Sequence, residues 1–150
     1  MPYRIEWLVT DRVLFVEISG SLTDAEQPVF FQTIADLSIR SPYQVHLVVD
    51  MTEQKQRLTI RQATQMALKH PMPRNLGWVV QVGKLSQPQV FLSSLIAQFF
   101  SVTLYAVDEM DEALAHLRFH DPTIDWLLAD YSVLSKPEGC SDYPLEECED

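Results

Sequence analysis

The sequence predicts an α/β domain: a mostly parallel five-stranded sheet with one antiparallel N-terminal strand and helices packed on it. Residues 45–49, Val-His-Leu-Val-Val, form a short apolar run rich in β-branched residues, which has the length of one strand buried on both faces. From Thr23 onward such runs alternate with segments of helical periodicity, a pattern typical of parallel strands joined by helices. The expected order of elements is β-β-α-β-α-β-α-β-α.

The first two strands are expected to form an antiparallel hairpin. Apolar residues alternate with more polar ones over residues 3–9, and a second apolar run covers residues 13–18 before Ser19-Gly20 ends it. Only Thr10-Asp11-Arg12 separates the two runs, whereas a parallel pair would need a much longer connection.

Capping residues indicate where the helices begin. Thr23 with Glu26 three residues later is a capping box, and Ser41-Pro42 ends the helix that follows. The later helices are expected to begin at Thr59, Ser86 and Asp108, and the strands between them to cover residues 78–82 and 102–107.

Charge and composition restrict the function. The chain has 150 residues and a formal net charge of −10. Six acidic residues and one lysine fall in residues 136–150, which we expect to be a disordered acidic tail on a single domain of residues 1–135. The domain has no basic stripe, so nucleic-acid binding is not expected. No signal segment precedes the first strand, and a cytoplasmic location is the expectation.

Several stretches carry a family resemblance: residues 11–16, 20–23 and 75–80, the strand that ends at Asp50, and Val107-Asp108 before Glu112-Ala113-Leu114. In this order they resemble the STAS domain of anti-sigma-factor antagonists and the related SpoIIAA-like, or STAS/Sec14, group over roughly residues 3–120. The resemblance implies a non-enzymatic regulatory domain that binds partner proteins.

Regulatory STAS domains carry a serine just after the third strand, in an Asp-Ser-Ser-Gly-like run that a partner kinase phosphorylates. The matching run here is Asp50-Met51-Thr52-Glu53, in which Met51 cannot accept phosphate, Thr52 stands one position later and the glycine is absent. The resemblance therefore implies a regulatory or partner-binding loop at Asp50, Thr52 and Glu53. The alternative is that Asp50 and Thr52 simply fix the loop after the strand.

Two further groups of residues suggest binding chemistry. Gly83-Lys84-Leu85-Ser86 lacks the upstream glycine and the hydroxyl residue after lysine of a nucleotide-binding loop, so Lys84 and Ser86 are expected to contact at most a simple anion or ligand at a helix start. His116 and His120 have a spacing that zinc can use, but no third ligand accompanies them. We expect no metal, no cofactor and no catalytic residue.

The segment from Leu85 to Val107 has no charged residue, yet its serines and glutamines argue against a membrane span. A helix over residues 86–100 would have one face of large apolar residues and an opposite face that is small and uncharged. That second face either lies under the chain's own tail or contacts another protein, such as a second copy in a homodimer. The candidate interface residues are Ser93, Ser94, Ala97 and Gln98.

The leading hypothesis is therefore a non-enzymatic STAS-like regulatory domain that acts through protein contacts, including self-association. The alternative is a small-ligand or lipid-binding module of Sec14-like type, with a pocket at the carboxyl ends of the central strands. An enzyme is the least favoured of the three hypotheses, because the sequence contains no motif of an activated nucleophile.

Overall fold

The computed structural model describes residues 3–20, 23, 25–54, 69, 73–84, 94, 98 and 102–134. The five strands of the sheet are β1 (Tyr3–Val9), β2 (Val13–Gly20), β3 (Val45–Gln54), β4 (Leu76–Val82) and β5 (Thr103–Val107). The helices are α1 (Glu26–Ile39), α4 (Met110–His120) and two 3-10 helices, η1 (Trp126–Leu128) and η2 (Tyr131–Leu134). Among the described residues no helix is long and apolar enough to cross a membrane.

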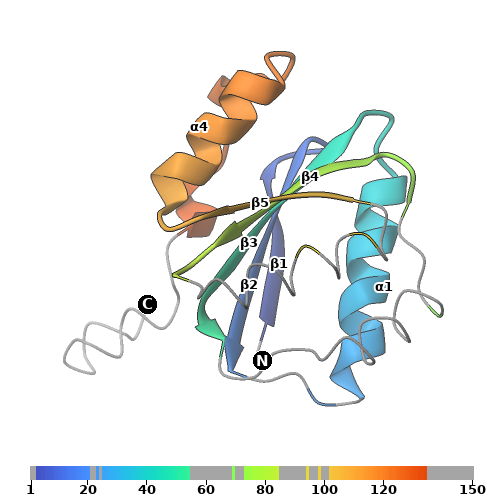
Figure 1. Cartoon of the computed structure of the whole chain (residues 1–150). Helices are drawn as coiled ribbons and strands as arrows, with labels where there is room; N and C mark the ends of the chain where they lie inside the picture. The colour runs from blue at the N-terminus through green and yellow to red at the C-terminus, as the bar shows by residue number, and fades with distance from the viewer. Residues whose placement is uncertain are drawn as a thin grey trace, which may run out of the picture.

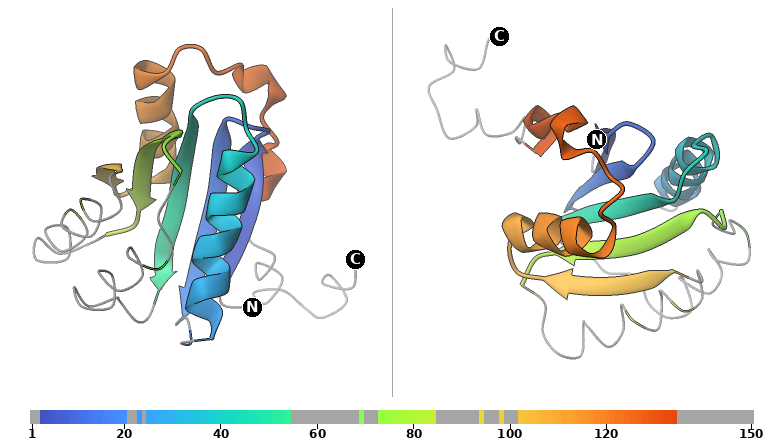
Figure 2. Two further views of the ribbon diagram at one scale, coloured as in Figure 1. Left: turned by 90° about the vertical axis from the view of Figure 1, so that its right-hand side faces the viewer. Right: turned by 90° about the horizontal axis from the view of Figure 1, so that it is seen from above.

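The sheet has the predicted mixed topology. Its strand order is β1-β2-β3-β4-β5, with β1 antiparallel to β2 and every other neighbouring pair parallel. Figure 1 shows α1 and α4 on opposite sides of this sheet, and both views of Figure 2 agree. The predicted α/β class and the N-terminal hairpin are thus confirmed.

Each face of the sheet has its own apolar core. Because side chains alternate along a strand, odd-numbered residues of β3 such as Val45 and Leu47 pack on the α1 side, and Val48 packs on the α4 side. The α1 side is closed by Phe30 and Ile34 of that helix. The α4 side is closed by buried residues of α4 and of the segment after it, namely Ala113, Leu114, Leu117, Ile124 and Val133.

The central strands are longer than the sequence indicated. Ser19 pairs with Glu53 and Gly20 with Gln54, so β2 and β3 remain hydrogen-bonded past the expected ends of both strands. A register irregularity between Glu17 and Ser19 accommodates this extension. The prediction that the third strand ends at Asp50 is therefore wrong, and Asp50, Thr52 and Glu53 lie within β3 instead of in a loop.

The helix caps agree with the sequence in part. The capping box forms as predicted: the backbone N–H of Glu26 donates to Thr23 Oγ1 at 3.2 Å, and Glu26 Oε1 accepts from the N–H of Thr23 at 2.9 Å. The cap of α4 is Glu109, one residue later than the predicted Asp108, because the carboxylate of Glu112 accepts from the N–H of Glu109. The expected helix starts at Thr59 and Ser86 and the tail at 136–150 lie outside the described residues.

Candidate functional site

The predicted regulatory position is held by a bond between its own residues. Asp50 is buried in β3, and its Oδ1 accepts hydrogen bonds from the backbone N–H of Thr52 at 3.0 Å and from Thr52 Oγ1 at 2.7 Å. The side chain of Thr52 is exposed. Asp50 and Thr52 thus hold the local backbone in place, which was the alternative to a phosphorylated loop. A phosphate on Thr52 would break the hydrogen bond between its hydroxyl and Asp50.

Gly83 directly follows β4 and lies between Met51 of β3 and the carboxyl end of β5. Its backbone has φ 145°, a conformation that favours glycine, and its N–H donates to the carbonyl of Val107 at 3.0 Å. A Cβ there would lie 3.4 Å from the backbone carbonyl carbon of Met51. Lys84 follows with an exposed side chain, whereas Ser86 lies outside the described residues. Lys84 thus lies just after the carboxyl end of β4 with its side chain open to solvent.

A row of charged residues that sequence reasoning missed crosses the first three strands. Arg4 of β1 pairs in register with Glu17 of β2, and Glu17 pairs with Asp50 of β3. Arg4 Nε lies 3.4 Å from Glu17 Oε1, and the guanidinium lies 5.2 Å from the centre of the Phe15 ring. Both carboxylates are buried, and Arg4 supplies a compensating charge to Glu17. The alternation of side chains along the strands alone would have placed Arg4 and Glu17 on a solvent-exposed face of the sheet.

At the other end of the sheet, His46 of β3 uses both ring nitrogens. Nδ1 accepts from the backbone N–H of Trp78 at 2.9 Å, so Nε2 carries the proton and donates to Asp121 Oδ2 at 2.8 Å. The ring is 1% exposed and lies against Gly77, where a Cβ would come within 2.6 Å of Cε1 and Nδ1. Burial lowers the pKa of His46 although the Asp121 carboxylate favours protonation.

Arg12 completes this network from the β1–β2 turn. Its Nη2 donates to Asp121 Oδ2 at 3.0 Å and to Thr123 Oγ1 at 2.8 Å, and its guanidinium lies 5.2 Å from the centre of the Tyr43 ring. Burial raises the pKa of Asp121, but hydrogen bonds from Thr123 and His46 outweigh burial and hold it below the ordinary value. The network fastens the chain after α4 to the sheet, which is a structural role.

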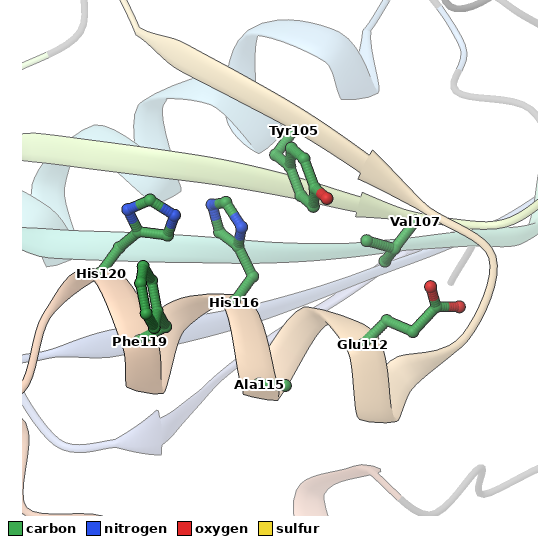
Figure 3. A pocket seen from close by; sticks show the side chains of 7 residues that line it. All are labelled: Tyr105, Val107, Glu112, Ala115, His116, Phe119 and His120. Atoms are coloured by element: carbon green, nitrogen blue, oxygen red, sulfur yellow. The ribbon is translucent and has the colours of Figure 1, made fainter.

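A pocket of about 330 Å³ lies where α4 crosses β5 (Figure 3). It is lined by the residues Tyr105, Val107, Glu112, Ala115, His116, Phe119 and His120. The Sec14-like alternative placed a pocket at the ends of the central strands, whereas this one lies at the edge strand. Its walls are aromatic, with a carboxylate at one end and two imidazoles at the other.

The two imidazoles of α4 belong to an aromatic cluster. His116 stacks on Tyr105 with ring centres 3.9 Å apart and an interplanar angle of 12°. Trp78 meets His116 edge to face, with the two ring centres 4.4 Å apart. The rings of His116 and His120 lie 4.2 Å apart. Burial and the neighbouring His120 lower the pKa of His116, so the ring is neutral at neutral pH. The helix thus reaches both histidines and brings them together, as their spacing indicated.

Large apolar side chains are exposed on the C-terminal part of the domain. Phe119 of α4 is 80% exposed, and the adjacent Leu127 and Leu128 of η1 are 94% and 71% exposed. Sequence periodicity could not identify these exposed leucines, because it does not show which side of a short 3-10 helix faces solvent.

The remaining predicted residues are only partly visible. Ser94 and Gln98 have helical backbone and exposed side chains, which agrees with their assignment to an outward face. Ser93 and Ala97 lie outside the described residues. Within the described part of the chain, no three side chains of the metal-binding types gather in one place. Searches of protein-family models and of curated proteins find no match to this chain.

Proposed function

We propose that this chain is a non-enzymatic regulatory domain of the STAS-like type that acts by binding another protein. The observation that carries the proposal is the pair of leucines, Leu127 and Leu128, that η1 presents to solvent. Single exposed apolar side chains are common, but two adjacent leucines that are 94% and 71% exposed form a ready contact surface.

The leucine pair is held in an ordered segment. Asp125 Oδ1 accepts from the N–H of Leu127 at 3.1 Å and caps η1. The guanidinium of Arg118 lies 5.0 Å from the centre of the Trp126 ring and donates to the hydroxyl of Tyr131 at 2.9 Å, which joins α4 to both 3-10 helices. A partner therefore meets a largely preformed surface and has little conformational entropy to remove.

Charge defines the partner that suits this surface. Five exposed carboxylates lie between residues 109 and 134, namely Glu109, Asp111, Glu112, Asp125 and Asp130. The arginine of this segment is Arg118. A protein with an apolar depression and a basic rim complements the leucines and the carboxylates together. A second copy of the chain would bring like charges together, so we rank self-association second.

Two buried polar groups, His46 and Asp50, support a non-enzymatic role. Both nitrogens of His46 are engaged, and the Oδ1 atom of Asp50 is occupied by its own neighbour Thr52. A general base needs a free lone pair that points at a substrate. These two groups serve the fold instead.

The small-ligand alternative is favoured by one observation, the pocket beside Tyr105 and His116. Its aromatic walls suit a flat ring, and the carboxylate of Glu112 suits a positive charge at one end. If the domain binds a small ligand, addition of that ligand should change the NMR chemical shifts of Tyr105. If it binds a protein, addition of the partner should change those of Leu127 and Leu128.

The test is affinity capture with the tagged full chain from the native host, followed by mass spectrometry. Leu127→Asp with Leu128→Asp places two more carboxylates on the surface without disturbing the core. Ile39→Asp is the matched control, since Ile39 of α1 is 68% exposed on a different element. We expect a basic protein that is captured by the wild type and the control, lost with the double variant, and released by salt.

Equal capture by the wild type and the double variant would overturn the proposed surface. Light scattering of the isolated chain identifies the partner class: a stable dimer that the double variant dissociates would assign the surface to self-association instead of to a basic partner.

A further inference from the structure

We propose that His116 and His120 form a binding site for a late first-row divalent transition metal ion such as Ni²⁺ or Zn²⁺. The proposal concerns a different part of the molecule from the leucine pair and does not depend on the proposed function. Imidazole nitrogen is a favoured ligand of these ions, and two histidines one helical turn apart can hold the same ion.

The first support is the mutual orientation of the rings. Both side chains leave the same side of α4, their ring centres lie 4.2 Å apart, and Figure 3 shows each with a ring nitrogen directed toward the other ring. A zinc–imidazole bond is about 2.0–2.1 Å long. Because His120 is exposed, a small rotation of its side chain brings its nitrogen onto an ion held by His116.

The second support is a nitrogen with no other use. Nε2 of His116 is buried and has no hydrogen-bond partner among the described residues. Aromatic packing against Tyr105 and Trp78 would be served equally well by phenylalanine, so packing leaves this nitrogen unexplained. The same packing fixes the orientation of the ring, as neighbouring groups do for the side chains that bind metal ions.

The third support is the open space beside the pair. The open pocket beside the pair leaves room for water or an outside molecule to complete the coordination. Glu112 lines the same pocket but already accepts from the N–H of Glu109, so the site has two protein ligands.

The test measures Ni²⁺ and Zn²⁺ binding to the full chain by isothermal titration calorimetry, with Mg²⁺ as the ion expected not to bind. Cys140 and Cys148 are replaced by serine throughout, because tail thiols bind the same ions. His120→Gln removes an exposed ligand, His116→Phe keeps the aromatic stack while removing the other, and His70→Gln is the control histidine.

We expect one equivalent of Ni²⁺ on the serine-substituted chain and on the His70→Gln control. Each ligand variant should bind at least about tenfold more weakly. In NMR spectra, paramagnetic Ni²⁺ should broaden the ring signals of His116 and His120 before those of His46. Equal affinity in the serine-substituted chain and in its His120→Gln variant, which leaves the core untouched, would overturn the proposal. Absence of binding to the serine-substituted chain would do the same.

Discussion

The imidazole of His46 lies so close to Gly77 that no side chain fits between them. A Cβ at residue 77 would come within 2.6 Å of the ring and 2.8 Å of the Gln44 side chain. The ring cannot retreat, because it is buried and is held at both nitrogens by Trp78 and Asp121. At this position glycine is required by close approach, whereas at Gly83 it suits a positive φ.

Gly77→Ala should therefore lower the free energy of unfolding by about 1–3 kcal/mol through overpacking. The measurement is urea unfolding followed by fluorescence. In a His46→Ala background the clash with the imidazole is removed and only the approach to the flexible Gln44 side chain remains, so the same glycine substitution should cost at least about 0.5 kcal/mol less. If the two costs are equal, the contact with His46 is not what requires the glycine.

The same histidine makes the stability depend on pH. Its folded-state pKa is lowered, so on acidification the unfolded chain takes up its proton first. The contribution of His46 to the free energy of unfolding is complete when the pH is above its unfolded-state pKa of about 6.5. It is lost as the pH falls from there toward the folded-state pKa, by up to about 1.4 kcal/mol for each pH unit. An NMR titration of the His46 ring should give a pKa below 6.5. A value above 6.5 would show that Asp121 outweighs burial.

At the scale of elements, Arg12 joins the β1–β2 turn to the segment that follows α4. Arg12→Lys keeps the charge but loses the fork that contacts Asp121 and Thr123 at once. We expect a loss of about 1–3 kcal/mol in the free energy of unfolding, measured in urea. Arg40→Lys, at the exposed end of α1, is the control and should change stability by less than about 0.5 kcal/mol.

The order of the described strands and helices could be predicted because the signals for it are local. A period of two over residues 3–9 and the Thr23 and Glu26 pair each depend on neighbours in the sequence. The end of β3 could not be predicted, because it is set by pairing of Ser19 and Gly20 with residues far along the chain. The pairing of His46 with Asp121 could not be predicted either, because it joins residues 75 positions apart.

The candidate sites also combine features that are visible in the sequence with features that depend on contacts between distant segments. The spacing of His116 and His120 is visible in the sequence, but the stacking on Tyr105 that fixes them comes from the crossing of α4 and β5. The resemblance to STAS domains directed attention to Thr52. It could not indicate that the Thr52 hydroxyl is bonded to Asp50 within a strand.

At the scale of the whole molecule, the acidic tail is expected to contribute little to folding. Residues 136–150 have clustered like charges and no apolar period. Deleting them should leave the melting temperature within about 4 °C of the full chain, measured by differential scanning calorimetry. A larger decrease would mean that Tyr143 or Leu145 docks on the domain.

Protein binding through η1 is the central claim, and site-specific photo-crosslinking in the native host tests it most directly. A benzophenone-bearing amino acid is placed at residue 128, and at residue 39 as the control on α1. We predict one crosslinked product of higher mass at residue 128 that contains a different, basic protein, with no product of that mass at residue 39. No crosslink at residue 128, or the same products at both positions, would contradict the claim that this surface binds a specific partner.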